Sequence, residues 1–348
     1  MRTSKATLLL LVACLPPEPP DWLITEPTFL GIQSSVVADG PHAEGLTVYP
    51  GNIRANPLPL DTLELRLLAA TPPGVTLRPP IWFRCVGYSG LSDCYEALIG
   101  VAPPDCPAPL PLSPSEVCRL GTGDGLRAQI ADIDTLASGQ KYASIGALAI
   151  TSAELDPEAC VTRIRDAAQD LTPCMIATRF VGFGPSWRFA ELRPSEDPDI
   201  PDDLPDEIRE APVDTNPWLY FAIQRTSAPG ETQLAVDGDT VTVRAGETIS
   251  VTVEPGDDAA QLDVFLVEDP DDPDASLVKT TPEELSYATF LAGPVELSTA
   301  HADDRTLTFV VPDTLEPVLV FASIDDDRSG IGAASLRFLA IRGGHEPP

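Results

Sequence analysis

Apolar and polar residues alternate in short runs through the C-terminal half of this 348-residue chain, and Gly, Pro and Asp separate the runs. A period of two places successive side chains on opposite faces of a β-strand. Residues 240–244 alternate in this way, a turn follows at Ala245-Gly246, and Ile249, Val251 and Val253 then share one face. The pattern therefore predicts strands in this half of the chain.

The same alternation predicts further strands at 262–267, 285–291, 306–311, 318–324 and 334–341. The last two runs flank an acidic turn and predict a hairpin. About seven short strands are typical of a β-sandwich of the immunoglobulin-like or fibronectin type III-like kind. Since this half has no cysteine, its two inner faces must supply the stability. The core residues that we expect there are Val251, Val264, Leu266, Phe309, Phe321 and Leu336.

The N-terminal half contains comparable apolar runs, and these predict a first sandwich. We expect its strands at 29–32, 47–51, 63–68, 81–85, 175–181 and 187–192, with a short helix inside 154–170. Trp82 in the run 81–85 resembles the buried tryptophan of the third strand of an immunoglobulin-like domain. The Pro- and Gly-rich segment from Cys85 to Cys118 is predicted to be a disulfide-stapled insertion.

Besides Cys14, six cysteines, all in this half, predict disulfide bonds and an oxidising compartment. Their spacing is not that of a zinc site, because neither CxxC pairs nor neighbouring histidines occur. Sequence alone does not fix the connectivity. Local spacing favours the three pairs Cys85–Cys94, Cys106–Cys118 and Cys160–Cys174.

The N-terminus has the pattern of a secretory signal. Arg2 and Lys5 precede the apolar run 6–13, which is far shorter than the roughly 20 residues that a membrane-spanning helix needs. Leu11-Val12-Ala13-Cys14 resembles the lipobox of bacterial lipoproteins. The resemblance implies that Cys14 carries diacylglycerol, that the chain is cleaved before it, and that the lipid anchors the protein to a membrane. Because Leu15 stands where many inner-membrane lipoproteins carry aspartate, we expect the outer membrane, on its periplasmic or cell-surface side.

Composition divides the mature chain. We expect a signal peptide at 1–13, a Pro-rich tether at 14–26 and an N-terminal immunoglobulin-like domain at 27–194. An acidic, Pro-rich stretch at 195–215 is predicted to be a stiff linker. A C-terminal immunoglobulin-like domain at 216–343 and a tail at 344–348 complete the chain. The fold class that we predict is mainly β, with two such sandwiches in tandem.

The chain carries a net charge of −31, which becomes −33 when Arg2 and Lys5 leave with the signal. Such a surface repels nucleic acid, so we expect no nucleic-acid partner. Motifs of catalysis are missing from the sequence: His42, His301 and His345 are isolated, and no GxSxG or HExxH occurs. We therefore expect neither an enzyme nor a bound cofactor.

Clustered carboxylates raise one metal hypothesis. Asp325, Asp326 and Asp327, like the aspartates of 269–274, supply the oxygen ligands that calcium prefers. Neither cluster has EF-hand spacing, and prolines interrupt the second, so solvated acidic turns are the favoured interpretation and we expect no metal site.

The mature chain resembles bacterial surface lipoproteins with two immunoglobulin-like domains, through its lipobox, Trp82 and Cys85, the Asn216-Pro217 junction and the acidic final hairpin. The resemblance implies an envelope protein that binds or scaffolds another protein or a surface polymer. The alternative is a carbohydrate-binding or carbohydrate-processing lipoprotein. An exposed Trp22, Trp187 or Trp218 would favour that alternative, and burial of these side chains would count against it.

Overall fold

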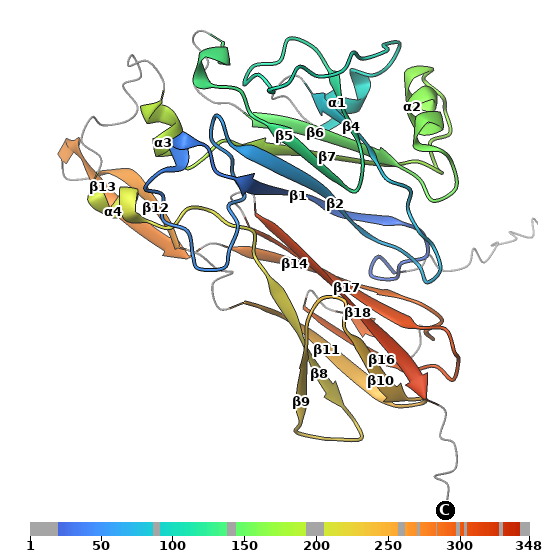
Figure 1. Cartoon of the computed structure of the whole chain (residues 1–348). Coiled ribbons are helices and arrows are strands. Elements are labelled where there is room, and N and C mark those ends of the chain that lie inside the picture. The colour runs from blue at the N-terminus through green and yellow to red at the C-terminus, as the bar shows by residue number, and fades with distance from the viewer. Residues whose placement is uncertain are drawn as a thin grey trace, which may run out of the picture.

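The computed structural model is built mainly of antiparallel β-sheets (Figure 1). It describes residues 20–85, 91–137, 144–192, 205–256, 262–269, 272–282, 284–296, 300–302, 305–326 and 330–341. The predicted mainly β class is confirmed. The predicted signal peptide 1–13, Cys14 and the tail 344–348 lie outside the described residues.

Two sheets pack face to face in the N-terminal half, and we call this pair the N-terminal sandwich. The first sheet has the order β1-β2-β5, from β1 (Thr28–Ala38), β2 (Thr62–Ala70) and β5 (Gly125–Gln129). The second has the order β4-β3-β6-β7, from β4 (Cys118–Thr122), β3 (Ile81–Cys85), β6 (Ser144–Thr151) and β7 (Met175–Gly182). Trp82 is completely buried between them with Ile32, Leu65 and Ile145, as its resemblance implies.

Short helices and two of the three disulfides, Cys85–Cys94 and Cys160–Cys174, cover the outer face of the β4-β3-β6-β7 sheet. A second apolar cluster joins that face to α1 (Leu91–Glu96) and α2 (Pro157–Arg165). Asp156 caps α2 by accepting a hydrogen bond from the backbone N–H of Glu158, and Pro157 starts the first turn. The helix predicted within 154–170 is thus confirmed. Two 3₁₀ helices, Pro41–Ala43 and Ile133–Thr135, lie in loops.

Another pair of sheets forms the C-terminal sandwich. One has the order β10-β18-β17-β14, from β10 (Thr240–Arg244), β18 (Ile331–Ile341), β17 (Val318–Asp326) and β14 (Leu285–Ala292). The other has the order β15-β16-β11-β8-β9, from β15 (His301–Ala302), β16 (Thr306–Val310), β11 (Thr248–Pro255), β8 (Leu219–Arg225) and β9 (Thr232–Ala235). Val251, Phe309 and Leu336 lie in the core between them, as predicted.

The two sandwiches are stacked, so that four sheets lie in consecutive layers (Figure 1). A small apolar cluster of Ile24, Ala70, Ala292 and Phe321 joins the β1-β2-β5 sheet to the β10-β18-β17-β14 sheet. The prediction that Phe321 belongs to the C-terminal core is therefore wrong: this side chain faces the other sandwich. Period-two alternation identifies two faces of a strand but not which layer covers each.

The strand predicted at 262–267 does not join the C-terminal sandwich. β12 (Leu262–Asp269) pairs with β13 (Asp272–Pro282) in a separate two-stranded sheet that projects from the stack (Figure 1). The side chains of Val264 and Leu266, which were predicted to lie in the sandwich core, are outside what the structure describes.

The predicted tether and linker are both partly wrong, because their folded ends belong to the stack. Ile24 is buried, and its N–H donates to the carbonyl oxygen of Leu291 on β14 at 2.8 Å. Within the predicted linker, 205–215 contains α4 (Asp206–Glu210) and the buried Val213 and Thr215. The Pro-rich and acidic composition of the two segments gave no sign that Ile24 and Val213 would be buried. The rest of both segments, 14–19 and 195–204, lies outside the described residues.

Two predicted N-terminal strands are wrong. Residues 47–51 form a turn with a single bridge from Thr47 to Pro212, and 187–192 lie in and just after α3 (Ser186–Glu191). In both places a short apolar run was too brief to distinguish a strand from other structure. Among the described residues, no helix is long and apolar enough to cross a membrane.

Candidate binding groove

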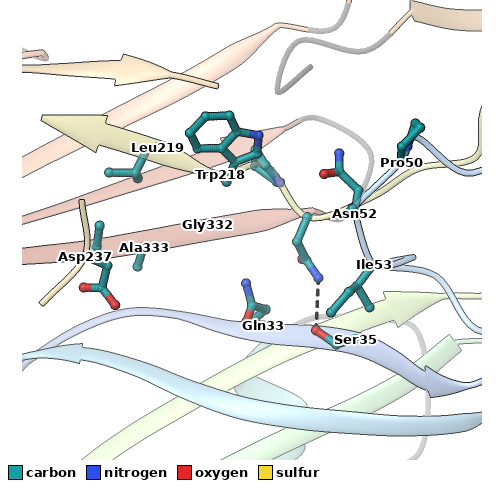
Figure 2. Close-up of a pocket in the computed structure, with 14 residues that line it drawn as sticks. Gln33, Ser35, Pro50, Asn52, Ile53, Trp218, Leu219, Asp237, Gly332 and Ala333 are labelled. Carbon is teal, nitrogen blue, oxygen red and sulfur yellow. Dashed lines mark hydrogen bonds between the residues drawn. The ribbon is translucent and has the colours of Figure 1, made fainter. Parts of the chain in front are cut away.

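A groove opens where the two sandwiches meet, and we call it the junction groove (Figure 2). Its volume is about 780 Å³, which is within the range of small-ligand sites. Its lining comes from β1, the loop before β2, the start of β8, the loop after β9, and β18. The lining residues are Gln33, Ser35, Pro50, Gly51, Asn52, Ile53, Asn216, Pro217, Trp218, Leu219, Asp237, Gly332, Ala333 and Ala334.

Small residues at the start of β18 leave the space that becomes the groove. Gly332, Ala333 and Ala334 carry little or no side chain. At Gly332 the backbone lies so close to Pro217 that a Cβ would overlap the Pro217 carbonyl oxygen. Glycine is therefore required for the approach of two backbones as well as for the cavity.

Asn216 joins the two sandwiches below the groove. Its side-chain Nδ2 donates to the Ser34 carbonyl oxygen at 2.6 Å and to the Ser35 Oγ at 3.2 Å. Its Oδ1 accepts from the N–H of Ile331 at 3.1 Å. One side chain thus links β1 of the N-terminal sandwich with β18 of the C-terminal sandwich, and the Ser35 bond is visible in Figure 2.

A buried ion network holds the long loop that forms one wall. Arg54, only 3% exposed, donates to Asp39 at 2.6 Å and to the fully buried Asp61 at 2.7 Å. Asp61 also accepts from the backbone N–H groups of Leu58 and Gly40, each at 2.6 Å. Because every one of these bonds lies within 39–61, the network fixes the loop that presents Asn52 to the groove.

Trp218 forms the aromatic edge of the groove, and 46% of it is exposed. One part of the indole lies on Gly256, where a Cβ would overlap the ring, and the Gly256 N–H donates to the Trp218 carbonyl oxygen at 2.8 Å. Tyr220 follows on the same face of β8, with its ring centroid 6.0 Å from that of Trp218. The chain thus builds a supported aromatic surface beside the groove.

Three polar side chains of the groove are anchored at one end. Gln33 Nε2 donates to the Ile331 carbonyl oxygen at 2.7 Å, Asn52 Nδ2 donates to Thr215 Oγ1 at 3.2 Å, and Asp237 Oδ1 accepts from the Ser335 N–H at 2.7 Å. Within the described residues, the other terminal atom of each has no hydrogen-bond partner in the protein. Those atoms are Gln33 Oε1, Asn52 Oδ1 and Asp237 Oδ2, all of them acceptors.

The lining combines an aromatic ring with uncharged polar groups and one carboxylate. Among the described residues that line the groove, none is a histidine, cysteine, lysine or arginine. The hydroxyl of Ser35 accepts a hydrogen bond from the Asn216 side chain, which is not a base. The arrangement can stack an apolar ring face and accept hydrogen bonds, but it lacks the nucleophile-and-base geometry of covalent catalysis.

None of the six sequence-predicted disulfide cysteines lines this groove, and Cys85, Cys94, Cys160 and Cys174 belong to the apolar cluster beside α1 and α2. The disulfides join Cys85 to Cys94, Cys106 to Cys118 and Cys160 to Cys174, which are the pairs that local spacing favours. Cys14, the predicted lipid attachment site, lies outside the described residues.

Of the aspartates considered for calcium, the structure describes the side chains of Asp325 and Asp326. Asp325 lies 3.7 Å from Arg179 of the N-terminal sandwich, and Asp326 is buried and accepts from the Gly330 N–H at 2.7 Å. Burial raises the pKa of Asp325, Arg179 lowers it, and Asp326 raises it further. Asp327 lies outside the described residues, and the part of the chain that is described contains no group of three or more metal-ligating side chains.

Sequence reasoning named Trp218 as a discriminating residue but did not predict the groove. Trp22 and Trp187 are half-buried, whereas Trp218 is exposed. The sequence signal was the Asn216-Pro217 junction, which directly precedes Trp218 and was part of the resemblance to two-domain lipoproteins. Gln33, Asn52 and Asp237 carry no motif, because segments far apart in the sequence bring them together.

No protein-family model matches the chain, and no curated protein matches it significantly. Among solved structures it is similar to one described as fibronectin(III)-like modules of Clostridium thermocellum CbhA, with 6% sequence identity and a TM-score of 0.21. The match covers 91% of this chain and 98% of that one. A score this low does not establish a common fold, so the sandwich assignment rests on the strand pairing and core contacts described above.

Proposed function

We propose that this protein is a non-enzymatic, lipid-anchored protein of the cell envelope that binds or scaffolds another protein or a surface polymer. The supporting observation is the junction groove, which presents an exposed aromatic ring and anchored polar groups on a rigid stack of sheets. Such preorganisation favours recognition, because little conformational entropy remains to be lost on binding.

Two further observations support the envelope location. The lipobox-like Leu11-Val12-Ala13-Cys14 supplies an acylation site. Three disulfides are consistent with an extracellular or periplasmic environment. On this proposal the anchor is in the outer membrane, and the lipid is the contact with it.

The second candidate is a carbohydrate-binding lipoprotein. The exposure of Trp218 favours it, since an indole face can stack on the apolar face of a sugar ring.

The test of the proposed function is cross-linking in cells followed by mass spectrometry of the material that co-purifies, in parallel with membrane fractionation. The whole tagged chain is compared with Cys14→Ala and with Trp218→Ala. We expect the unaltered chain in the outer-membrane fraction, Cys14→Ala in the soluble fraction, and one abundant partner or polymer that is lost with Trp218→Ala. A soluble unaltered chain would contradict the anchor, and an unchanged set of cross-links in Trp218→Ala would contradict binding at the groove.

A further inference from the structure

We infer that the junction groove binds a short segment of an uncharged glycan, with one sugar ring stacked on Trp218 and its hydroxyl groups donating hydrogen bonds to Gln33, Asn52 and Asp237. This inference rests on the proposed function and specifies the ligand of the same site.

The unpaired acceptor atoms of the groove favour a ligand with hydroxyl groups. The orientation of Gln33 is set because the Ile331 carbonyl oxygen can only accept, so Nε2 must point to it and Oε1 faces the groove. Asp237 is likewise held through Oδ1 by both the N–H and the hydroxyl of Ser335. Together with Asn52 Oδ1, the groove offers acceptors and therefore selects a ligand rich in donors. Sugar hydroxyls are such donors.

The aromatic surface beside the groove favours a ligand that also has an apolar face. Trp218, which directly precedes β8, and Tyr220 of β8 are neighbours, and their ring planes are inclined by 38°. Gly256 packs against the indole, and 46% of Trp218 is exposed. A ligand with alternating apolar and hydroxylated surfaces satisfies the ring and the three acceptors simultaneously, which a wholly apolar or wholly polar ligand does not.

Charge excludes the anionic glycans. Asp237 contributes a negative charge to the groove, and the described lining residues include no lysine or arginine to offset it. The chain as a whole carries −31. A uronic-acid or phosphate-bearing polymer would meet repulsion over the entire approach, and an uncharged one would not.

The experiment uses the whole chain, purified from cells in a detergent without a sugar headgroup. Isothermal titration calorimetry and tryptophan fluorescence are measured with neutral oligosaccharides of glucose, mannose, galactose and N-acetylglucosamine, and with oligogalacturonate as the anionic comparison. We expect at least one neutral series to bind with a Kd of about 1 mM or tighter and oligogalacturonate not to bind. Failure of every neutral series would overturn the inference, as would preferential binding of oligogalacturonate.

Variants test the individual contacts. Trp218→Ala should weaken binding by about tenfold or more. Gly256→Ala, which keeps the indole but displaces it, should also weaken binding. Asp237→Asn must keep an acceptor toward Ser335 and would turn its amide N–H₂ into the groove, so we expect a loss of about three- to tenfold. Asp237 is exposed, and this variant should fold normally.

The matched control is Trp187→Ala, which removes a half-buried indole that does not line the groove. Binding should be unchanged in this variant, and equal losses in Trp187→Ala and Trp218→Ala would count against the site. A protein that cross-links through Trp218 while every glycan fails to bind would overturn the glycan inference and leave the proposed function intact.

Discussion

The side chain of Asn216 donates a hydrogen bond to the main-chain oxygen of Ser34 across the boundary between the two sandwiches, at 2.6 Å. Asn216 immediately follows the segment that composition alone assigns to a linker, and Ser34 lies in the middle of β1. The bond therefore makes the junction a fixed part of the fold rather than a hinge.

Removal of the Asn216 amide should destabilise this junction. Asn216→Ala leaves the Ser34 carbonyl oxygen and the Ile331 N–H without that partner, and we expect a loss of about 1–3 kcal/mol in the free energy of unfolding. Urea denaturation of the whole chain measures it. Asn216→Asp keeps the acceptor for Ile331 but sets a carboxylate oxygen against the Ser34 carbonyl oxygen, so its loss should be at least as large. Identical unfolding midpoints for Asn216→Ala and the unaltered chain would contradict this role.

The contact between Gly332 and Pro217 should not accept a methyl group. Because a Cβ at Gly332 would overlap the Pro217 carbonyl oxygen, Gly332→Ala must shift one backbone segment, at a cost of about 1–3 kcal/mol. The groove should narrow at the same time. Gly182→Ala is the matched control, since a Cβ at Gly182 meets nothing within 4 Å. Thermal unfolding of both variants compares them, and equal melting temperatures would refute the steric argument.

The buried pair of Arg54 and Asp61 should be worth far more than the exposed ion pairs of this acidic protein. Arg54→Met leaves the fully buried Asp61 carboxylate without its cation, and we expect a loss of about 3–5 kcal/mol. Arg165→Met removes one partner of the exposed pair Arg165–Asp166, whose side chains are 41% and 63% exposed, so its effect should be about 0–1 kcal/mol. Guanidinium denaturation distinguishes the two, and similar losses would show that burial is not the deciding factor.

Asp325 should make stability depend on pH. Its pKa lies above the ordinary value of 3.8, chiefly because of burial, so the folded state favours the protonated carboxyl. The stabilisation linked to this group is complete below the unfolded pKa and is lost as pH rises through the folded pKa. Asp325→Asn imitates the protonated form and should gain stability relative to the unaltered chain as pH rises above 3.8, with no gain below it. Unfolding measured across acidic pH tests this, and a gain confined to lower pH would contradict it.

Local pattern was sufficient for the mainly β class, for most strands of the C-terminal sandwich, for the buried position of Trp82 and for the disulfide pairs. Each of these follows from short-range chemistry: side chains alternate along a strand, and cysteines close in sequence meet easily. The lipid anchor at Cys14 and the envelope role remain predictions of the same local kind.

Tertiary structure alone decided how the sheets are layered and therefore where the groove lies. Phe321 reads as a core residue of its own sandwich, yet it faces the other one, because strand alternation does not specify which sheet covers each face. Composition likewise made 205–215 a linker, whereas a few apolar and hydrogen-bonding residues dock it. Gln33, Asn52 and Asp237 belong to separate segments, and only the packing of two sandwiches brings their oxygens to one groove.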